Sequence, residues 1–74
     1  MKPIAVDSTS LETIAYDPDR EILEIGFRDQ KVYQYVRVPP RVHEELLSAP
    51  SKGSYFNRQI RGHYLYHQKG RSLS

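Results

Sequence analysis

The C-terminal segment GSYFNRQIRGHYLYHQKGR, residues 53–71, carries the side chains best suited to binding a polyanion. It combines four aromatic residues with three arginines, one lysine and two histidines, and it contains no acidic residue. Arginine binds phosphate oxygens through bidentate hydrogen bonds, and aromatic faces stack on unpaired nucleobases at about 1–3 kcal/mol per base. The competing interpretation is an amphipathic helix whose aromatic residues pack in the core while its cations face solvent.

Two groups of residues would form such a nucleic-acid interface. Arg58 and Arg61 are three positions apart, so on an α-helix they would project from the same side. The expected phosphate contacts come from Arg58, Arg61 and Lys52. The expected stacking residues are Tyr33, Tyr35 and Tyr64, and Tyr66 is a further candidate; Tyr33 and Tyr35 can serve only if they face solvent.

The charge of the chain is distributed unevenly. Three basic and seven acidic residues give residues 1–30 a net charge of −4, whereas eight basic and two acidic residues give residues 31–74 a net charge of +6. No acidic residue follows Glu45. Such an asymmetry produces an electric dipole whose positive end attracts polyanions, although a lopsided charge can also serve solubility alone.

His63 and His67 have the i, i+4 spacing of a two-histidine metal site. A third ligand is missing, because neither an acidic residue nor a cysteine follows Glu45. Gly62 is also expected to end the preceding helix before these histidines are reached. We therefore expect two surface histidines, and we assign neither a metal nor any other cofactor.

The chain lacks a recognisable catalytic constellation. His43, Glu44 and Glu45 are adjacent, so on a helix they would point in different directions. Neither a nucleophile elbow nor a glycine-rich phosphate loop is present. We therefore expect a protein that is not an enzyme and assign no catalytic residue.

Length and composition limit the classes of protein to which this chain can belong. Seventy-four residues form one small domain, and the absence of cysteine excludes disulfides and cysteine-based zinc sites. The N-terminal sequence MKPIAVDSTSLE has no apolar core typical of a signal peptide. The apolar runs are also too short to cross a membrane. We expect a cytoplasmic protein without a membrane partner, and a monomer in preference to an oligomer.

The first half of the chain shows the period-two pattern of β-strands. The segments 11–16, 21–28 and 32–38 are rich in β-branched and aromatic residues, and Asp17–Arg20 forms a turn between the first two. This pattern predicts a three-stranded antiparallel meander. Residues 1–5 are expected to be either loose or a short fourth strand at the N-terminal edge.

The register of the hairpin between the second and third strands is open. A two-residue loop at Asp29-Gln30 would place Tyr33 and Tyr35 opposite the apolar face of the second strand, and a three-residue loop would bury both beside Phe27. A shift of one residue moves every side chain to the other face. We slightly favour the two-residue loop.

The second half of the chain is expected to cover the sheet with two helices. The segment 41–49 places Val42 and Leu46 on one face, and the segment 55–61 does the same with Phe56 and Ile60. The second helix would be capped by Ser51 or Ser54, at a site where backbone N–H groups could also hold an anion. The sequence thus predicts an α+β fold with both helices on one face of the sheet. The single domain would span residues 6–66, followed by a flexible tail at 67–74.

Several short motifs resemble the KTSC domain family over roughly residues 6–66. The motifs are Asp7-Ser8, Ile14-Ala15-Tyr16-Asp17, Tyr33-x-Tyr35-x-x-Val38-Pro39 and Ala49-x-Ser51-x-Gly53-x-Tyr55-Phe56-Asn57-x-x-Ile60-Arg61. This family is named after the C-terminal extension of some lysyl-tRNA synthetases and also occurs as small single-domain bacterial proteins. Gln30 departs from the pattern, since a more permissive turn residue such as glycine is expected there.

The resemblance says little about function, although its synthetase connection suggests RNA binding. Together with the basic C-terminal half, it leads us to expect a small accessory module that binds RNA or another polyanion. The alternative is a protein-interaction or regulatory module of unknown partner. In that case tyrosines and arginines would anchor the interface. An exposed strand near residues 4–6 or 11–16 could also pair with a strand of the partner.

Overall fold

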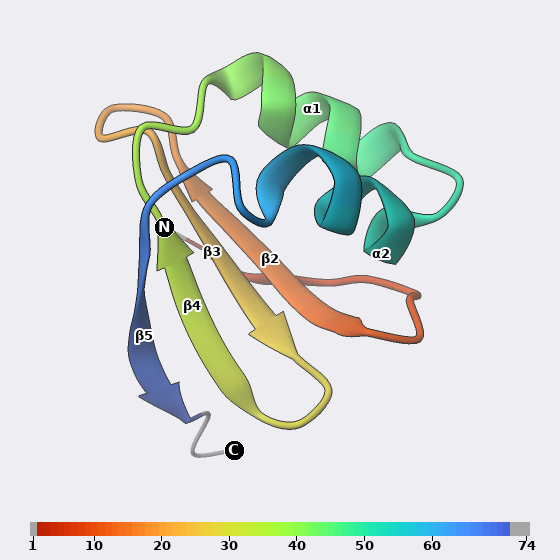
Figure 1. Ribbon diagram of the computed structural model, residues 1–74. Helices are drawn as coiled ribbons and strands as arrows, with labels where there is room; N and C mark the ends of the chain where they lie inside the picture. Colours follow the sequence, from red (N-terminus) through yellow and green to blue (C-terminus); the bar gives the residue numbers. More distant parts are fainter. Residues whose placement is uncertain (1, 72–74) are drawn as a thin grey trace.

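The computed structural model describes residues 2–71 as one five-stranded sheet covered on one face by helices (Figure 1). All strand pairings are antiparallel, and the strands follow one another across the sheet in the order β1-β2-β3-β4-β5. The helical segments are inserted between β4 and β5. The strands are β1 (Ile4–Ala5), β2 (Leu11–Asp17), β3 (Ile22–Phe27), β4 (Lys31–Tyr35) and β5 (Tyr66–Arg71). The helices are α1 (Pro40–Ser48), α2 (Lys52–Tyr55) and the π-helical turn η1 (Phe56–Ile60).

This architecture confirms the central meander and the helical cover predicted from the sequence. The N-terminal edge strand also forms, as β1. Strand β5 was not predicted, because a flexible tail was expected from residue 67. It pairs with β4 along its length and thereby makes the sheet five-stranded. Residues 72–74 of that expected tail lie outside the described residues.

The β3–β4 hairpin has the register that the sequence analysis disfavoured. Ile25 lies opposite Tyr33 and Leu23 opposite Tyr35, so the loop has three residues and not two. Gln30, the last residue of the loop, has a φ of 72° and donates its backbone N–H to the Phe27 carbonyl at 2.9 Å. A type I turn followed by a left-handed residue is a common three-residue hairpin loop. Both tyrosines consequently face the helices.

The helical segments begin and end largely where the sequence predicts. Pro39 precedes α1, and Ser51 caps α2 by accepting a hydrogen bond from the Ser54 backbone N–H at 3.3 Å. The second helix is not a continuous α-helix, because the Arg61 N–H bonds to the Phe56 carbonyl at 2.9 Å, five residues earlier. Gly62 then adopts a φ of 82°, a conformation that favours glycine, and the chain turns toward β5.

The core lies between the sheet and the helices. Strands β2 and β3 contribute Ile14, Leu23 and Ile25, and all three are almost completely buried. The helical segments place their buried side chains against them, in the pairs that the sequence predicts. These helical residues are Val42, Leu46, Phe56 and Ile60.

The opposite face of the sheet carries a group of polar contacts. Gln34 donates to the Glu24 carboxylate at 2.9 Å, and the Lys69 ammonium lies 3.2 Å from the same oxygen. These contacts join β3, β4 and β5 on the face away from the helices.

The two edges of the sheet are β1 and β5. Strand β2 lies between β1 and β3, so residues 11–16 do not form the exposed edge that we considered for partner binding. None of the helices in the described part of the chain has the length and apolar character needed to span a membrane.

Candidate functional site

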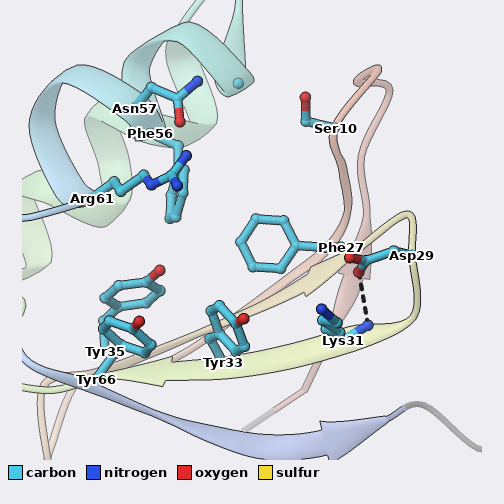
Figure 2. Close-up of a pocket in the computed structure, with 11 residues that line it drawn as sticks. Ser10, Phe27, Asp29, Lys31, Tyr33, Tyr35, Phe56, Asn57, Arg61 and Tyr66 are labelled. Carbon is cyan, nitrogen blue, oxygen red and sulfur yellow. Dashed lines mark hydrogen bonds between the residues drawn. The ribbon is translucent and has the colours of Figure 1, made fainter.

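A cleft of about 350 Å³ lies between the sheet and the α2–η1 segment. Figure 2 shows the tyrosines on the sheet and Phe56, Asn57 and Arg61 above them, on the helical side. The residues of the sheet side are Phe27, Tyr33, Tyr35 and Tyr66. The helical side adds Gly53, Phe56, Asn57 and Arg61, and the rim adds Ser10, Asp29 and Lys31.

Five aromatic rings form a continuous wall in this cleft. Tyr66 of β5 stacks on Tyr33 of β4, with ring centroids 5.1 Å apart and an interplanar angle of 28°. The Tyr66 centroid lies 5.2 Å from that of Tyr35, which in turn meets Phe56 edge-on at 5.5 Å. Phe27 meets Tyr33 edge-on at 5.3 Å and Phe56 at 5.4 Å. These geometries are favourable for aromatic pairs. The ring contacts therefore connect β3, β4, β5 and η1.

The rings differ in accessibility. Tyr35 is only 2% exposed and belongs to the core, whereas Tyr66 is 56% exposed. Tyr33 and Phe27 are half-buried. The wall therefore has a buried base at Tyr35 and Phe56 and an accessible surface at Phe27, Tyr33 and Tyr66.

Arg61 and Asn57 are the exposed polar residues of the helical side. Within residues 2–71, neither side chain makes a hydrogen bond or an ion pair with another described group. At the rim, Asp29 accepts a hydrogen bond from the Lys31 backbone N–H at 3.0 Å (Figure 2). The Arg61 guanidinium is therefore available to an anionic ligand.

The pKa of the Tyr35 hydroxyl depends on its burial and on the neighbouring charge of Arg61. Burial raises the pKa of Tyr35 to about 12, with smaller contributions from Tyr66 and Tyr33. The positive charge of Arg61 acts in the opposite direction and lowers the pKa. The phenol therefore stays protonated and can donate a hydrogen bond at neutral pH.

The predicted stacking residues do not form one exposed surface. Tyr35 offers no free face for stacking because it is buried in the core. Tyr33 lines the cleft, but Tyr64 lies outside the cleft lining and packs against the core. The hairpin register explains this result, since it turns the Tyr33–Tyr35 face toward the helices.

The predicted phosphate-binding residues are also separated. Arg61 lines the aromatic cleft, whereas Arg58 lines a different hollow, beside Glu45 and Tyr55. Arg58 and Arg61 were expected to project from the same side of an α-helix. They do not, because η1 is a π-helical turn and the backbone of Arg61 is extended. Lys52 donates to the Ala49 carbonyl at 3.3 Å and lines a third hollow with Asp7 and Ser51.

The two C-terminal histidines lie in different elements. His63 belongs to the turn after η1, and His67 lies in β5 opposite Gln34. Among residues 2–71, no three or more histidine, cysteine or acidic side chains are grouped so that they could hold a metal ion.

Several residues of the cleft are outside the set of site residues predicted from the sequence. Tyr66, which was only a further stacking candidate, joins the site because β5 pairs with β4 and places it opposite Tyr35. The tyrosines at 64 and 66, separated by Leu65, were the available signal, since alternating tyrosines suit a strand. Other missed residues come from a hairpin and loops that only the fold brings together. They are Ser10, Phe27, Asp29, Lys31 and Asn57.

Residues 7–64 match the family model described as the KTSC domain. The chain belongs to the KTSC domain family. An uncharacterised protein of Stutzerimonas stutzeri (strain A1501) is 43% identical over 67 residues, which cover 89% of this chain and 94% of that protein. The crystal structure of a KTSC domain protein from Yersinia pestis superposes with a TM-score of 0.91 at 43% identity, covering 93% of this chain and 97% of that one.

The KTSC domain is also related to a region of cyanobacterial lysyl-tRNA synthetases. The lysine–tRNA ligase of Nostoc sp. (strain PCC 7120) is 37% identical over 62 residues. The match covers 84% of this chain but only 11% of the ligase, and the ligase of Nostoc punctiforme gives the same values. The similarity is therefore to a small part of those enzymes, which is the C-terminal region.

Two of the motifs that carry the family resemblance meet at the cleft. The Tyr-x-Tyr motif contributes Tyr33 and Tyr35, and the motif that runs from Ala49 to Arg61 contributes Gly53, Phe56, Asn57 and Arg61. Tyr35 and Phe56 are buried, so packing accounts for them. Asn57 and Arg61 are exposed, so packing does not account for their place in the motif.

Proposed function

We propose that this KTSC protein is a non-enzymatic, cytoplasmic RNA-binding module that works as a monomer. The observation that carries the proposal is the position of Arg61, whose guanidinium is unpaired among the described residues and lines a cleft with the exposed ring of Tyr66. Arginine beside accessible aromatic rings is the combination that binds single-stranded nucleic acid.

Charge supports the same proposal. Arg61 lies in the half of the chain that has a net charge of +6, and no acidic residue follows Glu45. A cation that is not held in an ion pair can bind phosphate without first giving up a protein partner. The relation to a region of lysine–tRNA ligases is consistent with an RNA ligand for this family.

The proposal narrows the set of residues expected to contact RNA. Arg61 binds a phosphate, and Tyr33 and Tyr66 supply the stacking surface. Arg58 lines a separate hollow and Lys52 is bonded to the end of α1, so both contribute at most to a strand that extends beyond the cleft.

Fluorescence anisotropy with labelled single-stranded RNA, measured as a function of salt concentration, tests the proposal. The affinity should fall as salt rises, since phosphate contacts release counterions. The Arg61→Ala variant should lose about fivefold or more in affinity, and its log–log salt slope should shrink by about 0.7, the value for one phosphate contact on a single strand. Arg58→Ala is the matched control and should change both quantities less.

Two outcomes would contradict the proposal. The first is the absence of binding at low salt with micromolar protein. The second is binding whose affinity and salt slope are unaffected by Arg61→Ala.

A protein-interaction module is the second candidate function. Leu65 is 80% exposed and Tyr66 is 56% exposed, at the start of a strand that forms one edge of the sheet. Exposed apolar side chains beside an edge strand suit a partner that adds a strand. Salt-insensitive capture of one discrete protein, lost on substitution of Leu65, would favour this alternative.

A further inference from the structure

The cleft has the character of a site for one small planar ligand. Its volume of about 350 Å³ lies at the lower end of the range for small-molecule sites. It therefore suits a single inserted group better than a length of polymer.

Polar groups converge on this cleft without partners inside the protein. Tyr35 is 2% exposed, yet its hydroxyl forms no hydrogen bond with any described group. The same holds for the side chains of Asn57 and Arg61 on the helical side. No described side-chain oxygen or nitrogen is both sealed from solvent and unpaired, so the Tyr35 hydroxyl retains access to the cleft. A hydroxyl that opens to the base of a cleft and lacks a protein partner is free to bond to ordered water or to a ligand.

The arrangement of these groups restricts the chemistry of the ligand. The accessible rings of Phe27, Tyr33 and Tyr66 offer apolar and π surface to a flat group. Tyr35 can donate a hydrogen bond, and the Asn57 amide can both donate and accept, so an edge with mixed donors and acceptors can be bound. Arg61 adds a site for an anion on the same side as Asn57 (Figure 2).

We infer that the cleft binds one unpaired nucleotide of an RNA strand, with its base against Tyr33 and Tyr66 and a neighbouring phosphate on Arg61. This inference rests on the proposed function and specifies how RNA is recognised. A base enclosed in the cleft cannot remain in a duplex, so the module discriminates single-stranded from double-stranded RNA. The amide of Asn57 and the hydroxyl of Tyr35 contact the edge of the base that pairing would otherwise occupy.

Labelled RNA pentanucleotides and a fully abasic ribose-phosphate pentamer separate base binding from phosphate binding. The base-containing pentamer should bind the full chain at least fivefold more tightly than the abasic pentamer, in the range reported for stacking of one base. Tyr66→Ala should remove this difference, whereas Tyr66→Phe should keep it. Leu65→Ala is the matched control, since Leu65 is exposed and lies outside the cleft lining.

Each outcome of this experiment has a defined meaning. Equal, salt-dependent affinity for the two pentamers overturns the nucleotide site and leaves RNA binding intact. Binding of neither pentamer at low salt overturns both proposals. A nucleoside monophosphate that binds as tightly as the pentamer overturns RNA as the source of the nucleotide. Thermal unfolding of Tyr66→Ala verifies that this variant is folded, and Arg61→Gln gives an independent test on a second side chain.

Discussion

The ring of Tyr66 stacks on that of Tyr33, with centroids 5.1 Å apart, although the helical segments separate the two residues in the sequence. This contact exists because β5 returns to the sheet beside β4 after α1, α2 and η1. The same return brings Arg61, which lies between η1 and β5, to the mouth of the aromatic cleft. The candidate site is thus a product of the insertion of the helices between the last two strands.

Gly26 should be difficult to replace. A Cβ atom at this position would lie 2.3 Å from the Thr13 hydroxyl oxygen on the neighbouring strand β2. Gly26→Ala is therefore expected to lower the free energy of unfolding by about 1–3 kcal/mol, the usual range for overpacking. Urea denaturation measures this change.

A double-mutant cycle provides the control for this steric clash. Thr13→Ala removes the opposing hydroxyl, so Gly26→Ala should cost much less in that background. A cost that is the same with and without Thr13 would show that the clash is not the cause.

Gln30→Gly should stabilise the protein. Gln30 has a φ of 72°, and the left-handed region costs a non-glycine residue roughly 1–2 kcal/mol. The greater entropy of glycine in the unfolded chain offsets part of this gain, so we expect a net stabilisation of up to about 1 kcal/mol. Chemical denaturation of Gln59→Gly serves as the contrast, because Gln59 lies in η1 and should lose about 1 kcal/mol. Destabilisation by both substitutions would contradict the assigned loop.

His43 should make stability depend on pH. Its ring stacks on Tyr16 at 4.5 Å, and burial lowers its pKa below the ordinary value of 6.5, with partial opposition from Glu44. The unfolded chain therefore takes up the proton more readily than the folded protein. The stabilising contribution is complete above about pH 6.5, the unfolded value, and is lost as pH falls through the folded-state pKa.

The variant His43→Phe keeps an aromatic ring at the position and removes the titration. Urea denaturation at pH 7 and pH 5.5 should show a larger loss of stability in the wild type than in this variant. An NMR titration of His43 should give a midpoint below 6.5. Equal losses in the two proteins, or a midpoint above 6.5, would refute this role.

The sequence predicted the elements better than their register. The period-two runs and the Phe56–Ile60 spacing were sufficient for three strands and the helical cover, because burial on one face leaves a clear pattern. The β3–β4 register was predicted incorrectly, because two- and three-residue loops differ by one position and Gln30 is an atypical left-handed residue. Strand β5 was missed because the alternation of Tyr64 and Tyr66 does not continue beyond Tyr66, the only apolar side chain of the strand.

The candidate site was predicted only in part, for the same reason. Arg61 and Tyr33, which the sequence analysis assigned to one interface, both line the cleft. Tyr35 lies in the core because of the hairpin register. Arg58 lines another hollow because η1 is a π-helical turn. Asn57 and Lys31 could not be assigned without knowing which loops meet at the cleft.

The most direct test of the central claim is an NMR experiment that detects intermolecular NOEs between the protein and a short single-stranded RNA. The account predicts NOEs from the protons of one base to the rings of Tyr33 and Tyr66, with chemical-shift changes at Arg61. NOEs and shift changes confined to Arg58 and Lys52, or to His67 and Lys69 on the opposite face of the sheet, would contradict it.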